Sequence, residues 1–191
     1  MAGTFVYIDG FNLYHRALKD SAYKWLDLER FCDQVVDHRV DRVRYFTAPV
    51  KELAFNPGAR ARQFVYWRAL KTLPRVRIHE GKFVVNSKWR ALHHEPVGMK
   101  PASVVARVKV PEEKGSDVNL ASWLLMDAFR GRYDAAVVVS NDSDLVEPVR
   151  MVVHELGLPV AILNPSGSTH DQLKGTTRLS LTSGHLNYPR R

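Results

Sequence analysis

Four aspartates are the residues of this sequence whose type and position could do chemistry: Asp9, Asp117, Asp142 and Asp144. The first follows the β-rich run 5–8, and the last two follow the β-branched run 135–139. Both runs are predicted to be buried strands, and the carboxyl ends of parallel strands share one edge of a sheet. If the helix that begins near Asp117 starts at the same edge, the four carboxylates converge there.

Converging carboxylates need a positive charge between them, because like charges a few ångströms apart destabilise the folded state. A hard divalent cation such as Mg²⁺ or Mn²⁺ takes oxygen ligands and keeps water-filled positions for phosphate oxygens. It lowers the pKa of a bound water and stabilises a leaving oxygen. Asp142 and Asp144 are spaced to approach one cation region, and Ser140 and Asn141 can hold them by hydrogen bonds.

A simpler alternative is that each aspartate only caps a helix or lies in a turn, where Asp is favoured. Asp142 could cap a helix that begins near Leu145, and Asp117 could cap its own helix. For one aspartate alone this is the better interpretation, but it weakens when separate segments place carboxylates at predicted strand ends. Zinc is disfavoured, because no ligand spacing typical of zinc sites links Cys32, His38, His79, His93 and His94.

Strands and helices alternate along most of the chain, which predicts an α/β fold with a mostly parallel sheet flanked by helices. Strands are predicted at 5–8, 43–47, 76–79, 135–139 and 158–163, and helices at 13–18, 26–36, 59–70, 118–129 and 145–156. The helix at 118–129 is expected to open on a Ser/Asp cap and to close at Gly131. Residues 82–110 are predicted to form a β-hairpin-like insertion or long loop. We expect one domain over 1–165 and a tail over 166–191 that packs on it or extends from it.

Composition sets limits on the class of protein. The 191 residues suffice for a single domain with a hydrophobic core, and one cysteine excludes a disulfide framework. A reducing, cytoplasmic setting is expected, with neither a signal peptide nor an apolar run of the roughly 20 residues that a membrane helix needs. The net charge of +8 favours polyanionic partners without proving them.

Three segments resemble the NYN domain family, a branch of the PIN-like nucleases. They are 7–12 (YIDGFN), 113–119 (EKGSDVN) and 139–145 (VSNDSDL), in the family's order and with similar gaps. Arg62, Gln63, Tyr66, Gly81 and Phe83 resemble the bacterial branch, and 162–165 resembles its last strand. The resemblance covers nearly the whole chain, and the three motifs together are specific.

The resemblance implies a Rossmann-like PIN fold, a metal site and action on RNA. Position by position, Asp9, Asp117, Asp142 and Asp144 match the metal-binding acids of the family, and Asn12 and Ser140 match its polar helper residues. Asn141 stands where the family often has Gly, and Asn tolerates the same turn geometry. Not all members of the family are active nucleases, so the resemblance supports the fold more strongly than it supports the activity.

Candidate substrate contacts surround the acidic residues. Trp89 lies in a basic stretch of the insertion and could stack on a base of single-stranded RNA. Lys114 precedes Asp117 and could contact a phosphate or pair with a carboxylate. Arg62 and Gln63 lie on the helix 59–70, whose arginines could equally form a solvated face while Trp67 packs in the core.

Two further aspartates are assigned to structure. Asp127 lies ten residues after Asp117 on one predicted helix, a rise of about 15 Å, so the two cannot share a metal. We interpret Asp127 as a structural hydrogen-bonding residue and Asp134 as a turn residue that precedes a strand.

The resulting hypothesis is a Mg²⁺- or Mn²⁺-dependent ribonuclease, expected to cleave single-stranded RNA endonucleolytically. The alternative is a non-catalytic RNA-binding module with the same acidic pocket. A haloacid-type phosphatase is disfavoured, because Phe11 stands where its second carboxylate would be. A homodimer is plausible for a small protein, but no sequence feature requires it.

Overall fold

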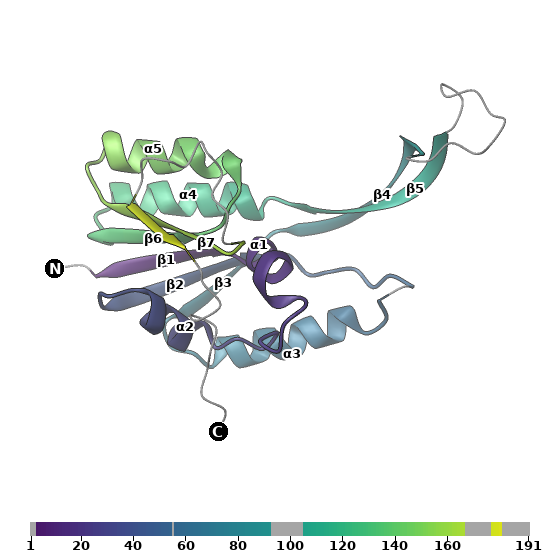
Figure 1. Cartoon of the computed structure of the whole chain (residues 1–191), viewed down its shortest axis with the longest axis horizontal. Helices are drawn as coiled ribbons and strands as arrows, with labels where there is room; N and C mark the ends of the chain where they lie inside the picture. Colours follow the sequence, from purple (N-terminus) through teal and green to yellow (C-terminus); the bar gives the residue numbers. More distant parts are fainter. Residues whose placement is uncertain (1–2, 55, 93–104, 167–176, 181–191) are drawn as a thin grey trace.

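Six parallel strands form the centre of the structure, a computed structural model that describes residues 3–54, 56–92, 105–166 and 177–180. Their order across the sheet is β3-β2-β1-β6-β7-β8 (Figure 1). Their bounds are Thr4–Asp9 (β1), Val40–Thr47 (β2), Val76–Glu80 (β3), Ala135–Val139 (β6), Val160–Asn164 (β7) and Thr177–Ser180 (β8). The predicted mostly parallel α/β sheet is confirmed.

The strand order reverses between β1 and β6. From β1 the chain moves outward through β2 to β3 and then returns to pair β6 with the other side of β1, with Ile8 opposite Val139. In open α/β sheets, ligands bind beyond the carboxyl ends of the strands at such a reversal. The residues that follow Ile8 and Val139, Asp9 and Ser140, therefore lie side by side at this point.

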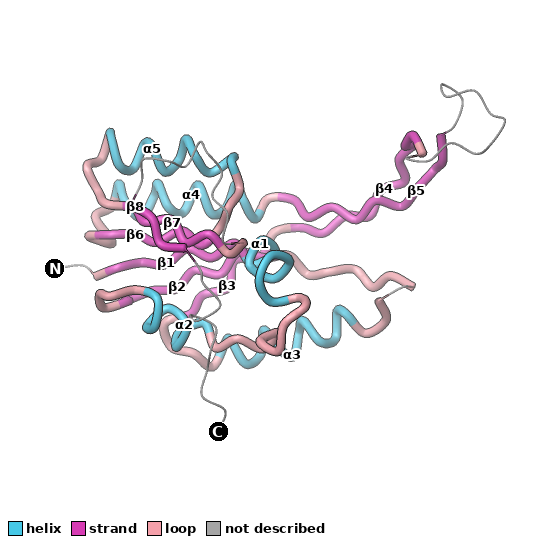
Figure 2. Tube along the Cα trace, viewed as in Figure 1, coloured by secondary structure: helices cyan, strands magenta, loops and turns pink. Residues whose placement is uncertain are grey.

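Helices cover both faces of the sheet (Figures 1 and 2). The α-helices are α1 (Gly10–Leu13), α2 (Leu28–Val35), α3 (Ala59–Lys71), α4 (Ser116–Phe129) and α5 (Val146–His154). A π-helical segment, η1 (Tyr14–Leu18), continues α1, and a 3₁₀ turn, η3 (Ser143–Leu145), leads into α5. In Figure 1, α4 and α5 lie on one side of the sheet and α2 and α3 on the other.

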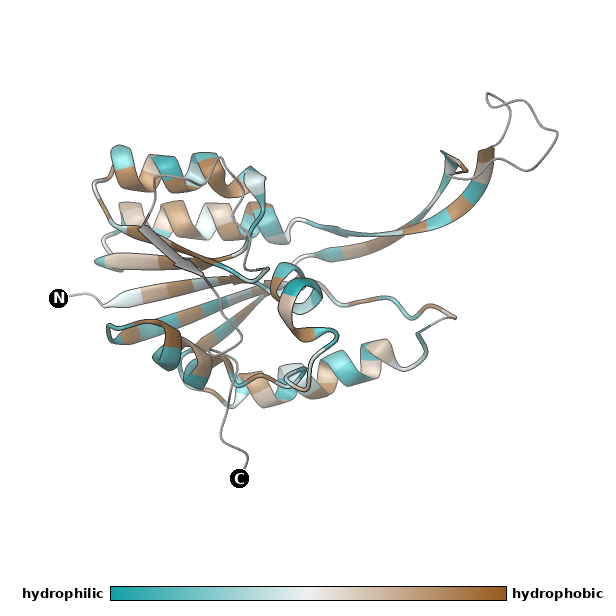
Figure 3. Cartoon of the chain, in the orientation of Figure 1, coloured by the Kyte–Doolittle hydropathy of each residue, from teal (hydrophilic) through white to brown (hydrophobic). Residues whose placement is uncertain are grey.

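Alternation along β1 divides the core in two. Val6 and Ile8 belong to one buried cluster, while Tyr7 between them belongs to the other. This follows from the two-residue period of a strand, whose successive side chains point to opposite faces. Figure 3 shows the hydrophobic residues concentrated in the sheet and on the helices beside it. Because β1 is buried on both faces, its end is fixed by packing, which positions Asp9.

Strands β4 (Lys82–Ala91) and β5 (Val105–Lys114) form an antiparallel ribbon that projects away from the sheet (Figure 1). We call this ribbon the arm. The predicted insertion over 82–110 is therefore a hairpin, whose second strand continues to Lys114. At its base, Phe83 stacks on Phe11 of α1, with 6.0 Å between ring centroids.

Several predicted boundaries differ from the structure. The Ser/Asp cap predicted for α4 is wrong: Ser116 and Asp117 lie within the helix, and its N-cap is Gly115, which has a φ of 88°. Glycine adopts this left-handed conformation without the cost of a Cβ. Within the tail, 177–180 pairs with β7 as β8, a strand that the weak pattern of the tail does not predict. His93 and His94 lie outside the described residues.

None of the helices in the described part of the chain has the length and apolar character that a membrane crossing requires.

Candidate active site

Asp9 is the centre of the candidate site. It is the last residue of β1 and caps α1, because its Oδ1 accepts a hydrogen bond from the backbone N–H of Asn12 at 3.0 Å. Its Oδ2 accepts a hydrogen bond from the Ser140 hydroxyl at 3.0 Å. One carboxylate thus joins the ends of β1 and β6.

Ser140 connects Asp9 to the second acidic residue. Its Oγ accepts a hydrogen bond from the backbone N–H of Asp142 at 3.1 Å. The Oδ1 of Asp142 in turn accepts from the backbone N–H of Asp144 at 3.0 Å and caps η3. The capping role that was the simpler alternative for Asp142 is therefore real, and it uses one of the two carboxylate oxygens.

Two asparagines link the loops that follow β1 and β6. Asn12 Nδ2 donates to Asn141 Oδ1 at 2.7 Å, and the backbone N–H of Asn141 donates to Asn12 Oδ1 at 3.3 Å. Asn141 Nδ2 also donates to the hydroxyl of Ser166, beyond β7, at 2.9 Å. The structure thus brings Asn12, Ser140 and Asn141 together with Asp9 and Asp142 at one edge.

The Asp9 carboxyl group has a raised pKa. Burial raises its pKa to about 6, and the neighbouring carboxylates of Asp142 and Glu113 raise it as well. The hydrogen bonds from Asn12 and Ser140 act in the opposite direction, because they stabilise the ionised form. At neutral pH the site therefore holds a largely buried negative charge that a bound cation would stabilise.

Glu113 is the site residue that the sequence analysis did not select. It lies near the end of β5, at the base of the arm, and its Oε1 accepts a hydrogen bond from the backbone N–H of Ser116 at 3.0 Å. This bond satisfies the first turn of α4 and holds the carboxylate at the sheet edge. The available signal was its place as the first residue of the 113–119 motif.

Asp117 and Asp144 are less closely connected to Asp9. The Asp117 carboxylate accepts from the neighbouring N–H of Val118 at 2.8 Å, and Asp144 is exposed. In the described ranges, no three acidic, histidine or cysteine side chains lie close enough together to hold a metal ion by themselves. Of the four predicted carboxylates, Asp9 and Asp142 are linked through Ser140, and the charges of Asp142 and Glu113 act on Asp9.

This donor set fits a sparsely liganded divalent cation. Mg²⁺ is commonly held by one or two carboxylates together with waters and substrate phosphates, rather than by a complete protein cage. Asp9 and Asp142 would provide the two carboxylates, and Glu113 would add a third negative charge. The oxygen ligands favour Mg²⁺ or Mn²⁺ over softer metals.

The predicted substrate residues have varied surroundings. Trp89 is 67% exposed on the arm, whereas Trp67 is buried, as the core alternative predicted. The Lys114 ammonium lies 3.6 Å from a Glu112 oxygen, and the lysine side chain is mostly exposed. Arg62 donates to the Pro57 carbonyl and to the Asn56 side chain, so it holds the turn before α3.

Gln63 connects α3 to the segment that follows β2. It accepts from the backbone N–H of Val50 and donates to the carbonyl of Ala48, both at 2.9 Å. These contacts give Gln63 a structural role in the folded chain.

The structural role predicted for Asp127 is confirmed. Its buried carboxylate accepts from Arg44 at 2.6 and 3.0 Å, from the Tyr7 hydroxyl at 2.8 Å and from Arg132 at 3.1 Å. Asp134 directly precedes β6, and its backbone N–H donates to the Gly3 carbonyl.

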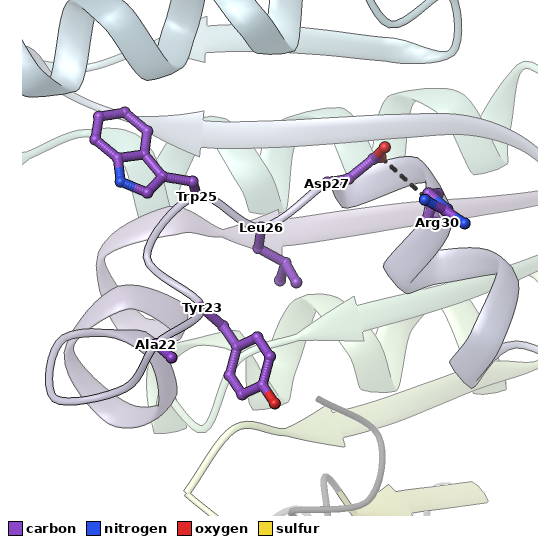
Figure 4. A pocket seen from close by; sticks show the side chains of 6 residues that line it. All are labelled: Ala22, Tyr23, Trp25, Leu26, Asp27 and Arg30. Carbon is purple, nitrogen blue, oxygen red and sulfur yellow. Dashed lines mark hydrogen bonds between the residues drawn. The ribbon is translucent and has the colours of Figure 1, made fainter. Parts of the chain in front are cut away.

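Two hollows lie apart from this acidic edge. One has a cavity volume of about 230 Å³ and is formed by the 22–30 segment between η1 and α2 (Figure 4). The other has a volume of about 450 Å³ and lies against β2, β3 and α4. None of the predicted site residues lines either hollow.

The parallel sheet, its reversal at β1 and β6, and the acidic residues at that point define a Rossmann-like α/β domain of the PIN-like class. The chain matches the NYN domain over residues 3–178 and belongs to the NYN domain family.

Two individual proteins extend the comparison. The chain is 31% identical over 186 residues to 6-hydroxy-3-succinoylpyridine 3-monooxygenase HspA of Pseudomonas putida (strain DSM 28022 / S16). The match covers 85% of this chain and 59% of that protein. The crystal structure of VPA0982, a protein of unknown function from Vibrio parahaemolyticus RIMD 2210633, matches with a TM-score of 0.56 and 13% identity, over 95% of this chain and 94% of that one. At that identity the likeness concerns the fold alone.

Proposed function

We propose that this chain is a metal-dependent ribonuclease that hydrolyses phosphodiester bonds of single-stranded RNA. The observation that supports the proposal is the half-buried Asp9 carboxylate at the switch point of the sheet, which is linked to Asp142 through Ser140 and feels the charges of Asp142 and Glu113. Membership of a family of PIN-like nucleases gives this site its chemical class. The proposal includes endonucleolytic cleavage, a cytoplasmic location and a homodimer.

In this proposal Asp9 and Asp142 would hold Mg²⁺ or Mn²⁺, and Asp117 and Asp144 would add negative charge around it. The bound cation would supply a water of lowered pKa and would stabilise the leaving 3′ oxygen. Ser140 and Asn12 orient Asp9 by the hydrogen bonds that they donate to its two oxygens. Asn141 and Lys114 lie beside these acids in the sequence and are proposed to contact a substrate phosphate.

The arm offers a track for RNA toward this site. Side chains alternate along each strand, so in the observed register Glu113, Lys109 and Arg107 of β5 share one face of the ribbon with Ser87 and Trp89 of β4. From Glu113 to Arg107 this face extends about 20 Å, at roughly 3.3 Å per residue.

Basic groups with an exposed aromatic ring are the usual means of holding single-stranded nucleic acid. On this face Trp89 pairs across the ribbon with Arg107, and Ser87 pairs with Lys109. We propose that Trp89 stacks on a base while the two cations contact phosphates. The substrate would then reach the acidic edge past Glu113.

The decisive experiment compares the parent protein with Asp142→Asn on labelled single-stranded and duplex RNA, in Mg²⁺, Mn²⁺ or EDTA. Cleavage by the parent that needs the cation, and its loss in Asp142→Asn, would support the ribonuclease. Asp134→Asn is the matched control, because Asp134 is an exposed aspartate at the other end of β6. RNA binding without cleavage would favour the non-catalytic alternative, and equal cleavage by Asp142→Asn would indicate a contaminating nuclease.

The Pseudomonas putida relative supplies a second candidate, the hydroxylation of a hydroxypyridine. A monooxygenase inserts one oxygen atom of O₂ into its substrate and reduces the other to water with two electrons from a reductant. Consumption of O₂ that requires both a two-electron reductant and 6-hydroxy-3-succinoylpyridine would favour this candidate over the ribonuclease. Because the match spans 59% of the relative, the activity of that whole protein does not transfer by identity alone.

A further inference from the structure

A basic pocket lies on the sheet face beside α4, apart from the acidic edge. Its cavity volume is about 450 Å³, and four arginines line it with two aromatic walls: Arg42, Arg44, Arg77, Arg132, Phe5 and Trp123. Small-molecule sites in proteins commonly have volumes of 300–1,000 Å³. The pocket therefore has the size for a ligand as large as a nucleotide.

Strand register brings the arginines together. Arg42 and Arg44 are two residues apart on β2 and so point to the same face of the sheet, and Arg77 of β3 is the direct partner of Arg44. Phe5 of β1 is the partner of Arg42 and forms the adjoining wall. The arrangement is thus built into the central sheet and does not depend on flexible loops.

Negative charge in the pocket is insufficient for these arginines. Asp127 lies beneath them and pairs with Arg44 at 2.6 Å and with Arg132 at 3.1 Å. Arg77 donates to two backbone carbonyls, those of Pro74 and Val76. Across the described ranges, no carboxylate forms an ion pair with Arg42 or Arg77. Arg77 is exposed and Arg42 is half-buried, so an anion from solution can reach both guanidinium groups.

The neighbouring groups increase this imbalance. Burial lowers the pKa of Arg42 and the repulsion from Arg77 and Arg44 lowers it further, although the Asp127 charge acts in the opposite direction. His79 lies within hydrogen-bond distance of Arg44, at 3.0 Å, and is neutral at pH 7, because burial and Arg44 lower its pKa to about 4. The guanidinium of Arg44 lies 4.0 Å from the centre of the Trp123 ring and so is fixed from a second side.

We propose that this pocket binds a small anion in which a phosphate or carboxylate is attached to a planar ring. Arg42 and Arg77 would hold the anionic group, since guanidinium forks bind phosphate and carboxylate oxygens in pairs. Trp123 and Phe5 would contact the ring. Phe5 precedes Asp9 by four residues on β1, roughly 13 Å along the strand, so this site is separate from the acidic edge.

The test is isothermal titration of the full chain in EDTA with AMP, adenosine, benzoate and inorganic phosphate. AMP or benzoate is expected to bind, and adenosine, which lacks the charge, is not. Binding of AMP alone would identify a phosphate ligand, and binding of benzoate alone a carboxylate. Added salt should weaken either interaction, because the contact is ionic.

Substitutions of single arginines test whether the anion binds in this pocket. Arg77→Ala and Arg42→Ala should each weaken it about 10-fold or more, as expected for a hydrogen bond to a charged group. Arg68→Ala, an exposed arginine of α3 outside the pocket, should leave it unchanged. Asp142→Asn should also bind like the parent, which separates this proposal from the ribonuclease. Absence of binding by AMP, benzoate and phosphate at millimolar concentration would overturn it, as would equal affinity in the Arg77 and Arg42 variants.

Discussion

The buried ion pair between Asp127 and Arg44 allows a direct test of what stabilises this domain. The Asp127 side chain is fully buried and that of Arg44 is 9% exposed, so neither can exchange its partner for bulk water. Replacing Asp127 by Asn removes the negative charge and leaves the guanidinium buried without a counterion. Loss of one partner from a buried pair costs about 3–5 kcal/mol.

The other contacts of Asp127 contribute less to this estimate. Arg132 is 42% exposed, and water can replace much of its interaction with the carboxylate. In Asp127→Asn, the amide oxygen of the new side chain still accepts a hydrogen bond of ordinary strength from the Tyr7 hydroxyl. For a chain of this length, a loss of 3–5 kcal/mol corresponds to a decrease in Tm of about 10 °C.

Urea unfolding followed by far-ultraviolet circular dichroism measures the effect. Asp134→Asn, which changes an exposed aspartate close in sequence, should alter the free energy of unfolding by less than about 0.5 kcal/mol. The triple variant Arg44→Met, Asp127→Leu, Tyr7→Phe removes both charges and the hydroxyl together and should recover most of the stability. A loss below about 1 kcal/mol in Asp127→Asn would refute the reasoning, since it would mean that Arg44 is solvated.

Three further predictions concern the site and the arm. The folded pKa of Asp9, about 6, exceeds its ordinary 3.8, so its stabilising contribution is present below pH 4 and is lost as pH rises through 6. In EDTA at pH 8, Asp9→Asn should therefore have a free energy of unfolding higher by up to roughly 3 kcal/mol and a higher urea midpoint. Equal midpoints would contradict this. Gly10→Ala would place a Cβ 2.6 Å from Tyr45 and should lower the free energy of unfolding by about 1–3 kcal/mol. The Tm and RNA cleavage should both decrease. Arg107→Ala should reduce the salt dependence of RNA binding by about one phosphate contact, measured by anisotropy in EDTA, whereas Arg90→Ala on the opposite face should have a smaller effect.

Much of the fold follows from local sequence patterns. The apolar runs before Asp9 and Asp142 are continuous because their strands are buried on both faces, so their ends can be located from sequence alone. The buried residues of α2, which are Leu28, Phe31, Cys32 and Val35, lie at helical spacing, so this helix can be located from its apolar residues. For this reason the sequence alone could predict that Asp9 and the residues hydrogen-bonded to it lie at the ends of strands.

Other features depend on contacts that a local pattern does not specify. The pairing of β6 with β1 is set by packing of distant segments, and it brings Ser140 to Asp9. Glu113 reaches the site through the register of the arm, in a strand without a core of its own. The π-helical segment 14–18 and the strand 177–180 also lack a distinguishing sequence period.

The base of the arm has a consequence for how this protein can change. Lys82 and Lys114 pair directly, so the two chain segments that enter and leave the globular part are held together there, whatever lies beyond them. Residues could be added or removed in opposed pairs farther out without altering this junction. The length and surface of the arm can therefore change at one location while the acidic edge stays intact, which makes the ribbon an exchangeable module.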